Sequence, residues 1–212
     1  MGLFTLLTLY IVRHGETEWN IENKLQGWMD SALTNKGIDH SLRLQKRLEP
    51  IHFQHIYASP SGRAVHTANL IKGLQNIEVK TIEDLKEIHL GSWEGKTHDE
   101  VKILEPERYD HFWNAPHLYI ADTGETFVQL QQRVVNFLSS IVSKHTEGNI
   151  LIVTHTVFIK MLLAYMKYLP ISELWGPPYI KDTSLSIIEF KNGSSNILLE
   201  ADIEHLLTEE FI

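Results

Sequence analysis

The 212-residue sequence predicts an α/β fold: a three-layer α/β/α sandwich with a mostly parallel central sheet and a small, mainly helical cap insertion. Two apolar segments, residues 6–12 and 150–153, have the almost continuous β-forming pattern of strands that are covered on both faces, as in a parallel sheet. The second segment is followed directly by residues 157–168, which have helical spacing and end before Pro170. Strand, short turn and helix therefore follow one another as they do in α/β proteins.

Other parts of the chain predict further elements of both kinds. Thr34 is a candidate helix N-cap, and the helix that it begins is expected to end before Pro50. Asn192 and Gly193 form a strong turn signal, so the strand before them is expected to belong to a hairpin. In chain order, the expected elements are a surface helix at 34–48, a short strand at 55–59, helices at 63–74 and 126–138, and a late strand at 183–190.

Residues 87–134 have poor periodicity, because glycines and prolines interrupt the segment and aromatic residues are scattered through it. Such a segment is a candidate cap over a site. We place the cap insertion at roughly 89–125, within a single domain that spans residues 1–212. Its aromatic side chains are interpreted first as packing residues and only second as specificity residues.

The composition argues against several classes of function. A formal net charge of −8 disfavours a general attraction to nucleic acid or to an anionic membrane, so an anion must be captured by a local cluster. The absence of cysteine removes disulfides and thiolate metal sites, and it fits a reducing compartment such as the cytoplasm. No apolar run is long enough to span a bilayer. His52 and His55 lack nearby acidic ligands, so no metal site is expected.

Two histidines follow the two apolar strands, His14 in "LYIVRH" and His155 in "ILIVTH". A lone histidine after a strand is usually structural. Ligands of parallel α/β sheets bind beyond the carboxyl ends of the strands, however, so two histidines in matching positions are expected to share one crevice. Arg13 is expected to lower the pKa of the His14 imidazole and to hold a phosphate or carboxylate with its planar guanidinium. A neutral imidazole is a nucleophile.

Six motifs extend this pattern along the chain in a fixed order: "RHGET", "QGWMDSALTNKG", "ASPSGRAVHTA", "LKEIHLGSWEG", "GET" and "VTH". The ordered set resembles the histidine phosphatase, or phosphoglycerate mutase-like, superfamily from Tyr10 to about Phe190. The resemblance implies that His14 becomes phosphohistidine and that Glu87 donates a proton to the leaving oxygen. It also implies a pocket around the phosphoryl group formed by Arg13, Arg63 and His155, with further contacts to phosphate or substrate from Asn20, Gln26 and Gly27. Thr156 stands where the family usually has glycine after the second histidine, and we expect it to contact the substrate.

The chemistry of phosphoryl transfer explains these residue types. The transferred group carries charge on three oxygens, so fixed donors around it can supply the positive charge without a metal or another cofactor. A buried Glu87 is expected to have a raised pKa and to act first as an acid and then as a base. Without the surrounding motifs, Arg63 would be interpreted as an exposed helix residue, and Glu87 as the partner of a surface lysine such as Lys86. The motifs around them favour a place in the active site for both residues.

Residues near the predicted cap have simpler interpretations. Glu125 is expected to open the helix at 126–138 rather than to contact the pocket, with Thr123 or Thr126 as its cap. Gln129, Arg133 and the C-terminal segment from residue 200 to residue 212 are expected to be solvated surface.

The length of the cap favours hydrolysis over mutase chemistry. Glu87 and His155 are 68 residues apart, which is short beside the mutases that the motifs resemble, and a smaller cap leaves access for water. The chain therefore resembles a small broad-specificity phosphatase that acts on a small phosphorylated metabolite, as a monomer or a homodimer. Two alternatives stay open: a 2,3-bisphosphoglycerate-dependent phosphoglycerate mutase, and a weakly active binding or scaffold protein.

Overall fold

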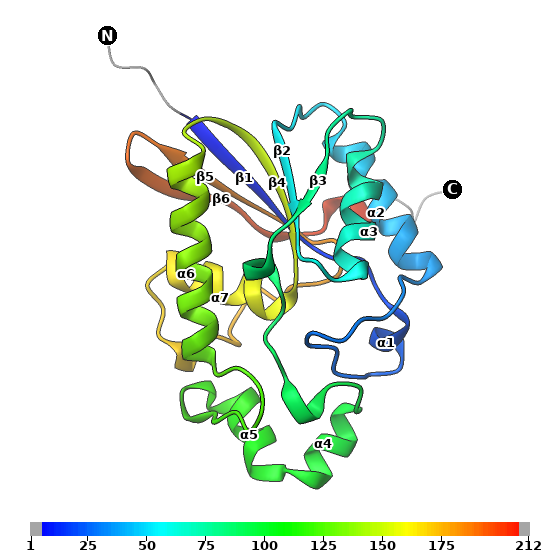
Figure 1. Ribbon diagram of the computed structural model, residues 1–212, viewed down its shortest axis with the longest axis vertical. Coiled ribbons are helices and arrows are strands. Elements are labelled where there is room, and N and C mark those ends of the chain that lie inside the picture. The colour runs from blue at the N-terminus through cyan, green and yellow to red at the C-terminus, as the bar shows by residue number, and fades with distance from the viewer. Residues whose placement is uncertain (1–5, 208–212) are drawn as a thin grey trace.

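The centre of the molecule is one β-sheet, seen in a computed structural model that describes residues 6–207 (Figure 1). Its strands are β1 (Leu6–Arg13), β2 (His55–Ala58), β3 (Val79–Thr81), β4 (Gly148–Thr154), β5 (Leu185–Lys191) and β6 (Ser194–Asp202). Their order is β3-β2-β4-β1-β5-β6. The first four strands of this order are parallel, whereas β5 is antiparallel to β1 and to β6. The prediction of a mostly parallel sheet is confirmed.

Helices cover both faces of this sheet. They are α1 (Glu18–Ile21), α2 (Asn35–Leu48), α3 (Gly62–Lys72), α4 (His98–Leu104), α5 (Pro106–Asn114), α6 (Phe127–Lys144) and α7 (Thr156–Met166). Short 3-10 helices lie at η1 (Glu83–Leu85), η2 (Gly91–Trp93), η3 (Pro116–Leu118), η4 (Ile171–Glu173) and η5 (Glu204–Leu206). In Figure 1, α4 and α5 lie at the lower end of the molecule, beyond the sheet.

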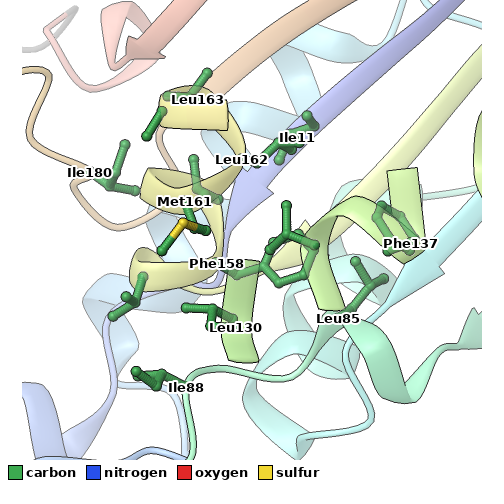
Figure 2. Packing of buried hydrophobic residues seen from close by; sticks show 14 of the residues in the cluster. Ile11, Leu85, Ile88, Leu130, Phe137, Phe158, Met161, Leu162, Leu163 and Ile180 are labelled. Carbon is green, nitrogen blue, oxygen red and sulfur yellow. The ribbon is translucent and has the colours of Figure 1, made fainter. Parts of the chain in front are cut away.

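Each face of the sheet has its own hydrophobic core, because successive side chains of a strand point to opposite faces. In β1, Leu9 and Ile11 join the core that contains α6 and α7, whereas Val12 joins the core that contains α2 and α3. Figure 2 shows the first core, to which Phe158 and Leu162 of α7 and Ile11 of β1 contribute their side chains. The apolar pattern of β1 therefore reflects burial on both faces, which confirms the predicted three-layer sandwich.

Polar side chains begin the helices where the sequence predicted them. The Thr34 hydroxyl accepts a hydrogen bond from the Gly37 backbone N–H at 2.9 Å at the start of α2. Thr126 caps α6 in the same way and exchanges bonds with Gln129, so Thr126 and not Thr123 is the cap. The helix runs to Lys144, beyond the predicted end, because buried residues continue on the same face of the helix.

The C-terminal part of the chain differs from the prediction of a solvated surface. Residues 200–202 complete β6, which forms the expected hairpin with β5 through the turn at Asn192 and Gly193. His205 in η5 is buried, and its ring bonds the Thr183 hydroxyl. Asp202 pairs with Arg47 of α2, and this distant partner explains why an acidic segment packs onto the domain. Residues 208–212 of the predicted segment lie outside the described residues.

Two other short elements were absent from the prediction. The strand β3 has three residues, which are mostly exposed at the edge of the sheet, so it has no apolar pattern to detect. The helix α1 has four residues and depends on a capping box between Thr17 and Asn20. The rings of Trp93, Tyr119 and Phe127 pack around Phe112 of α5, and all four residues join the core that contains α6 and α7.

Candidate active site

The two histidines that follow apolar strands lie side by side. The strands β1 and β4 are parallel neighbours, and their register places Arg13 opposite Thr154. His14 and His155 are the next residues of their strands, and the backbone N–H of His14 donates to the Thr154 carbonyl at 3.0 Å. Their ring centroids are 5.2 Å apart. The structure therefore brings together the two histidines that the sequence placed in one crevice.

Hydrogen bonding leaves the Nε2 atom of His14 as the reactive nitrogen. Nδ1 donates to the Gly15 carbonyl at 2.8 Å, so Nε2 carries the lone pair of the neutral ring. The side chain is 4% exposed. Burial, followed by the positive charges of Arg63 and Arg13, holds the pKa of His14 well below its usual range. The expected direction is confirmed, but the expected cause was incomplete, because burial and Arg63 outweigh Arg13.

Arg63 is the central residue of the site rather than an exposed helix residue. It is the second residue of α3, its side chain is 1% exposed, and it pairs with Asp30 at 2.9 Å. Its Nε donates to His14 Nε2 at 3.3 Å, and its Nη2 lies 3.2 Å from His155 Nδ1. Its remaining acceptors are the carbonyl oxygens of Gly27 and Met29. One guanidinium therefore connects both histidines to the loop that follows α1.

The contacts of His155 and Arg13 assign different tasks to the two residues. Because Arg63 can only donate, His155 accepts at Nδ1, and its Nε2–H donates to the Ser59 hydroxyl at 2.7 Å. Burial first, and then Arg63, holds the pKa of His155 well below its usual range. Arg13 donates from Nη1 to the Ile180 carbonyl at 3.0 Å, whereas its buried Nε has no partner among the described residues. His155 thus orients Arg63, and Arg13 keeps a donor for a ligand.

Glu87 lies at the N-terminus of α7. Burial is the main influence on its carboxyl group and raises the pKa, while backbone N–H groups and Arg63 oppose this shift. Lys86 pairs with Glu83 at 2.7 Å and not with Glu87, so the alternative of a surface ion pair is wrong. The carboxyl oxygens of Glu87 accept hydrogen bonds from the backbone N–H groups of Ile88, Val157 and Phe158, at 2.9 to 3.2 Å.

Asn20 and Gln26 line the pocket in front of His14, and both also bond Thr17. The Asn20 side-chain oxygen accepts from the Thr17 backbone N–H at 3.0 Å, which closes the capping box of α1. Only the side-chain NH2 group of Asn20 therefore remains to donate to a substrate. Gln26 donates to the Thr17 hydroxyl at 2.8 Å, and its buried Oε1 has no partner among the described residues.

Gly27 and Thr156 form parts of the pocket wall. Gly27 has a φ of +52°, and a Cβ atom there would lie 2.2 Å from Glu94 Oε1, so the position favours glycine. Its carbonyl faces Arg63, which makes it a partner of the guanidinium. Thr156 is the first residue of α7, where backbone N–H groups favour an anion.

The prediction that Arg133 is a solvated surface residue is wrong. Its side chain is 14% exposed and pairs with Glu125 at 2.5 Å. It also donates to the Glu87 carbonyl at 3.1 Å. Glu125 precedes the Thr126 cap, as expected, but its carboxylate faces Arg133. The sequence contains no local signal for this arrangement, because the acceptors on the segment before Glu87 are backbone carbonyls.

Lys160 is a pocket residue that the sequence interpretation missed. It is buried in α7, and its ammonium group donates to the carbonyl oxygens of Gly176 and, at 3.0 Å, Pro178. Burial lowers its pKa. A lysine inside the apolar helix pattern of residues 157–168 was the available signal, since a buried ammonium group requires acceptors.

Most of these side chains line one pocket of about 410 Å³, although His155, Glu125 and Arg133 are not among the described residues that line it. Arg13, His14, Arg63 and Glu87 line it at one end, and α4, α5, α7 and the loop before β5 supply the other walls. Within residues 6–207, no group of three or more histidine and acidic residues is arranged to hold a metal ion. In the same range, no helix has the length and apolar character needed to cross a membrane. The rest of the lining is mostly apolar and aromatic: Leu25, Ile88, Leu90, Phe112, Trp113, Val157, Trp175, Tyr179 and Ile180.

Comparisons with known proteins point to one family. Residues 9–203 match the model of the histidine phosphatase superfamily (branch 1). The solved structure of YhfR from Bacillus stearothermophilus is 48% identical, with a TM-score of 0.92 over 94% of this chain and 99% of that chain. Phosphoglycerate mutase-like protein 4 of Arabidopsis thaliana is 33% identical over 96% of this chain and 89% of its own length. A metal-independent phosphoserine phosphatase of the same plant is 30% identical over 96% of this chain and 85% of its own length.

Proposed function

Because the chain belongs to branch 1 of the histidine phosphatase superfamily, we propose that it hydrolyses small phosphomonoesters through a phosphohistidine formed on His14. The family and its phosphatase relatives make the chain a phosphomonoesterase. One observation carries the assignment of residues. A buried neutral imidazole, with Nε2 as its lone-pair nitrogen, shares a pocket end with two arginines and a carboxyl group of raised pKa.

The proposed reaction has two steps. In the first, His14 Nε2 attacks phosphorus, the bond from phosphorus to the ester oxygen breaks, and Glu87 gives its proton to that oxygen. In the second, the Glu87 carboxylate takes a proton from the water that attacks the phosphohistidine, and the phosphorus–nitrogen bond breaks. Arg13 and Arg63 stabilise the charge on the transferring oxygens, which makes the chemistry metal-independent. His155 keeps Arg63 in place.

The remainder of the pocket supports a preference for esters with an apolar leaving group. Apart from the reacting groups, its lining is mostly apolar and aromatic, and α5 contributes Phe112 and Trp113. Lys24, His98 and Lys160 add polar groups at separate points of the wall. We propose that the segment of roughly 89–125 caps the site in this way, within a single domain. The proposed substrate is a small phosphorylated metabolite, the proposed location is the cytoplasm, and the proposed assembly is a monomer or a homodimer.

The nucleophile is tested with His14→Asn on 4-nitrophenyl phosphate in the presence of EDTA. Wild-type protein is expected to release phosphate, and the variant is expected to lose about three or more orders of magnitude in kcat, because both nitrogens of the neighbouring His155 ring are engaged by Arg63 and Ser59. His66→Asn, which changes an exposed histidine of α3, is the matched control. Quenched wild-type enzyme is expected to carry an acid-labile phosphoryl group that His14→Asn lacks. Full activity of His14→Asn would refute the proposal.

The mutase alternative is tested with the same protein. Conversion of 3-phosphoglycerate into 2-phosphoglycerate that depends on 2,3-bisphosphoglycerate, with slow phosphate release, would replace the phosphatase assignment. The scaffold alternative requires that cells which carry His14→Asn keep the function of the protein. We expect neither outcome, because the nucleophile, the carboxyl group and both arginines meet in one pocket.

A further inference from the structure

Arg133 of α6 has five N–H donors, and five acceptors surround them. Nε and Nη2 donate to the two carboxylate oxygens of Glu125 at 2.9 and 2.5 Å. Nη1 donates to the carbonyl oxygens of Asp84 and Lys86 at 2.9 and 2.6 Å, and Nη2 also donates to the Glu87 carbonyl at 3.1 Å. The planar geometry of a guanidinium group suits such a set of acceptors, and lysine cannot reproduce it.

The backbone that Arg133 holds is the segment that carries Glu87. Residues 86–90 lie outside helices and strands, so the regular hydrogen bonds of a helix or sheet do not satisfy their carbonyl groups. Glu125 holds the other side of the same segment, since its backbone N–H donates to the His89 carbonyl at 2.7 Å and its carboxylate accepts from the His89 N–H at 3.3 Å. Arg133 of α6 and Glu125, which precedes the cap of α6, therefore fix the backbone on both sides of Glu87.

We propose that Arg133, with Glu125 as its partner, is a positioning residue that sets the place of the Glu87 carboxyl group for proton transfer. This inference rests on the proposed function. Neither Arg133 nor Glu125 is among the described residues that line the pocket, and the carboxylate of Glu125 balances the charge of Arg133. Arg133 thus acts on the reaction through Glu87 and not through the substrate.

A comparison of leaving groups separates this role from general support of the fold. An alkoxide leaves only when an acid protonates it, whereas 4-nitrophenolate is a stable anion that leaves unaided. For both esters, kcat/KM reports the steps up to transfer of the phosphoryl group to His14. A misplaced Glu87 therefore lowers kcat/KM for an alkyl phosphate more than for 4-nitrophenyl phosphate. A general distortion of the residues around the phosphoryl group lowers kcat/KM equally for both esters.

The experiment measures kcat/KM for propyl phosphate and 4-nitrophenyl phosphate in four proteins: wild type, Arg133→Lys, Glu87→Gln and Arg47→Lys. Arg133→Lys is expected to lose about 10- to 100-fold on propyl phosphate, because small displacements of catalytic groups are costly, and to change little on 4-nitrophenyl phosphate. Arg47→Lys is the matched control, because Arg47 pairs with Asp202 and Glu204 near the C-terminus and should leave both values unchanged.

Each outcome has one meaning. Equal losses on the two esters in Arg133→Lys, or no loss on either, would overturn the positioning role. If Glu87→Gln itself shows no selective loss on propyl phosphate, the proposed function fails, because Glu87 is then not the acid. That result would refute the role of Glu87 and not the contacts of Arg133. If Arg133→Lys does not fold by circular dichroism, Glu125→Gln takes its place, since it weakens the same clamp. A selective loss in that variant supports the proposal, and an equal loss or no loss overturns it.

Discussion

Burial acts in opposite directions on the two reacting side chains. It lowers the pKa of His14, because it disfavours the imidazolium, and it raises the pKa of Glu87, because it disfavours the carboxylate. Both groups are therefore driven toward their neutral forms. A neutral imidazole is the nucleophile and a neutral carboxyl is the acid, so the same desolvation prepares both partners of the first step.

This arrangement predicts the pH dependence of kcat/KM for an alkyl phosphate. Activity should fall in acid only below the ordinary histidine range, where His14 becomes protonated. It should fall in base as Glu87 ionises, above the ordinary glutamate range. Glu87→Gln is expected to remove the alkaline fall and to lower the maximum. The second ionisation of a phosphate ester, with a pKa of about 6, affects wild type and variant alike, so their ratio isolates Glu87. An unchanged alkaline fall in Glu87→Gln would assign it to another group.

The loop that carries His14 is held between two helices. Gly15 donates its backbone N–H to the Thr67 hydroxyl of α3 at 3.0 Å, and a Cβ atom on Gly15 would lie 2.7 Å from the Gly37 carbonyl of α2. A Cβ atom on Gly37 would lie 2.2 Å from the Glu16 carbonyl. Both contacts are with backbone atoms, so neither neighbour can move away without shifting a whole element.

Gly37→Ala is therefore expected to push α2 away from the loop after β1. The free energy of unfolding should fall by about 1–3 kcal/mol, as overpacked sites do, and kcat should fall as His14 moves. Urea denaturation and phosphatase assays measure the two effects. Asn35→Ala, at an exposed position in the first turn of the same helix, is the control. Unchanged stability in Gly37→Ala would mean that the loop and helix are not in close contact in solution.

At the scale of the whole molecule, the C-terminal hairpin and η5 pack back onto the edge of the site. His205 bonds the Thr183 hydroxyl at 3.0 Å, and Thr183 donates its backbone N–H to the His14 carbonyl at 3.4 Å. The end of the described chain is therefore connected to the loop of the nucleophile. Burial first, and then the charge of Arg47, lowers the pKa of His205 to about 4.

This shift makes global stability depend on pH. An unfolded histidine binds a proton below about pH 6.5, whereas folded His205 does so only near pH 4, so the unfolded state takes up the proton first. The contribution of His205 to the free energy of unfolding is complete above pH 6.5 and is lost as the pH falls toward 4. His205→Asn is expected to reduce the loss of unfolding free energy across this range by roughly 1 to 3 kcal/mol. Urea titrations at pH 7 and 4.5 measure it, with His66→Asn as the exposed control. Equal losses in all three proteins would contradict the assignment.

The sequence by itself determined the features that depend on local patterns. Continuous apolar runs predicted β1 and β4, Thr34 and Thr126 marked helix starts, and histidines after two strands predicted a shared crevice. The structure brings Arg63 and Glu87 to that crevice too, and the ordered motifs identified the family. These features could be predicted because periodicity, helix caps and strand ends depend on residues that are neighbours in the sequence.

Only the tertiary structure decided how charged side chains are paired and buried. Arg133, expected at the surface, holds the backbone before Glu87, and Lys160 holds carbonyl groups of the loop before β5. His205 is buried although its segment is acidic. In each case the partner is a backbone carbonyl or a residue far along the chain. A carbonyl group is the same in every residue, so the sequence carries no sign of which ones a distant guanidinium or ammonium group will meet.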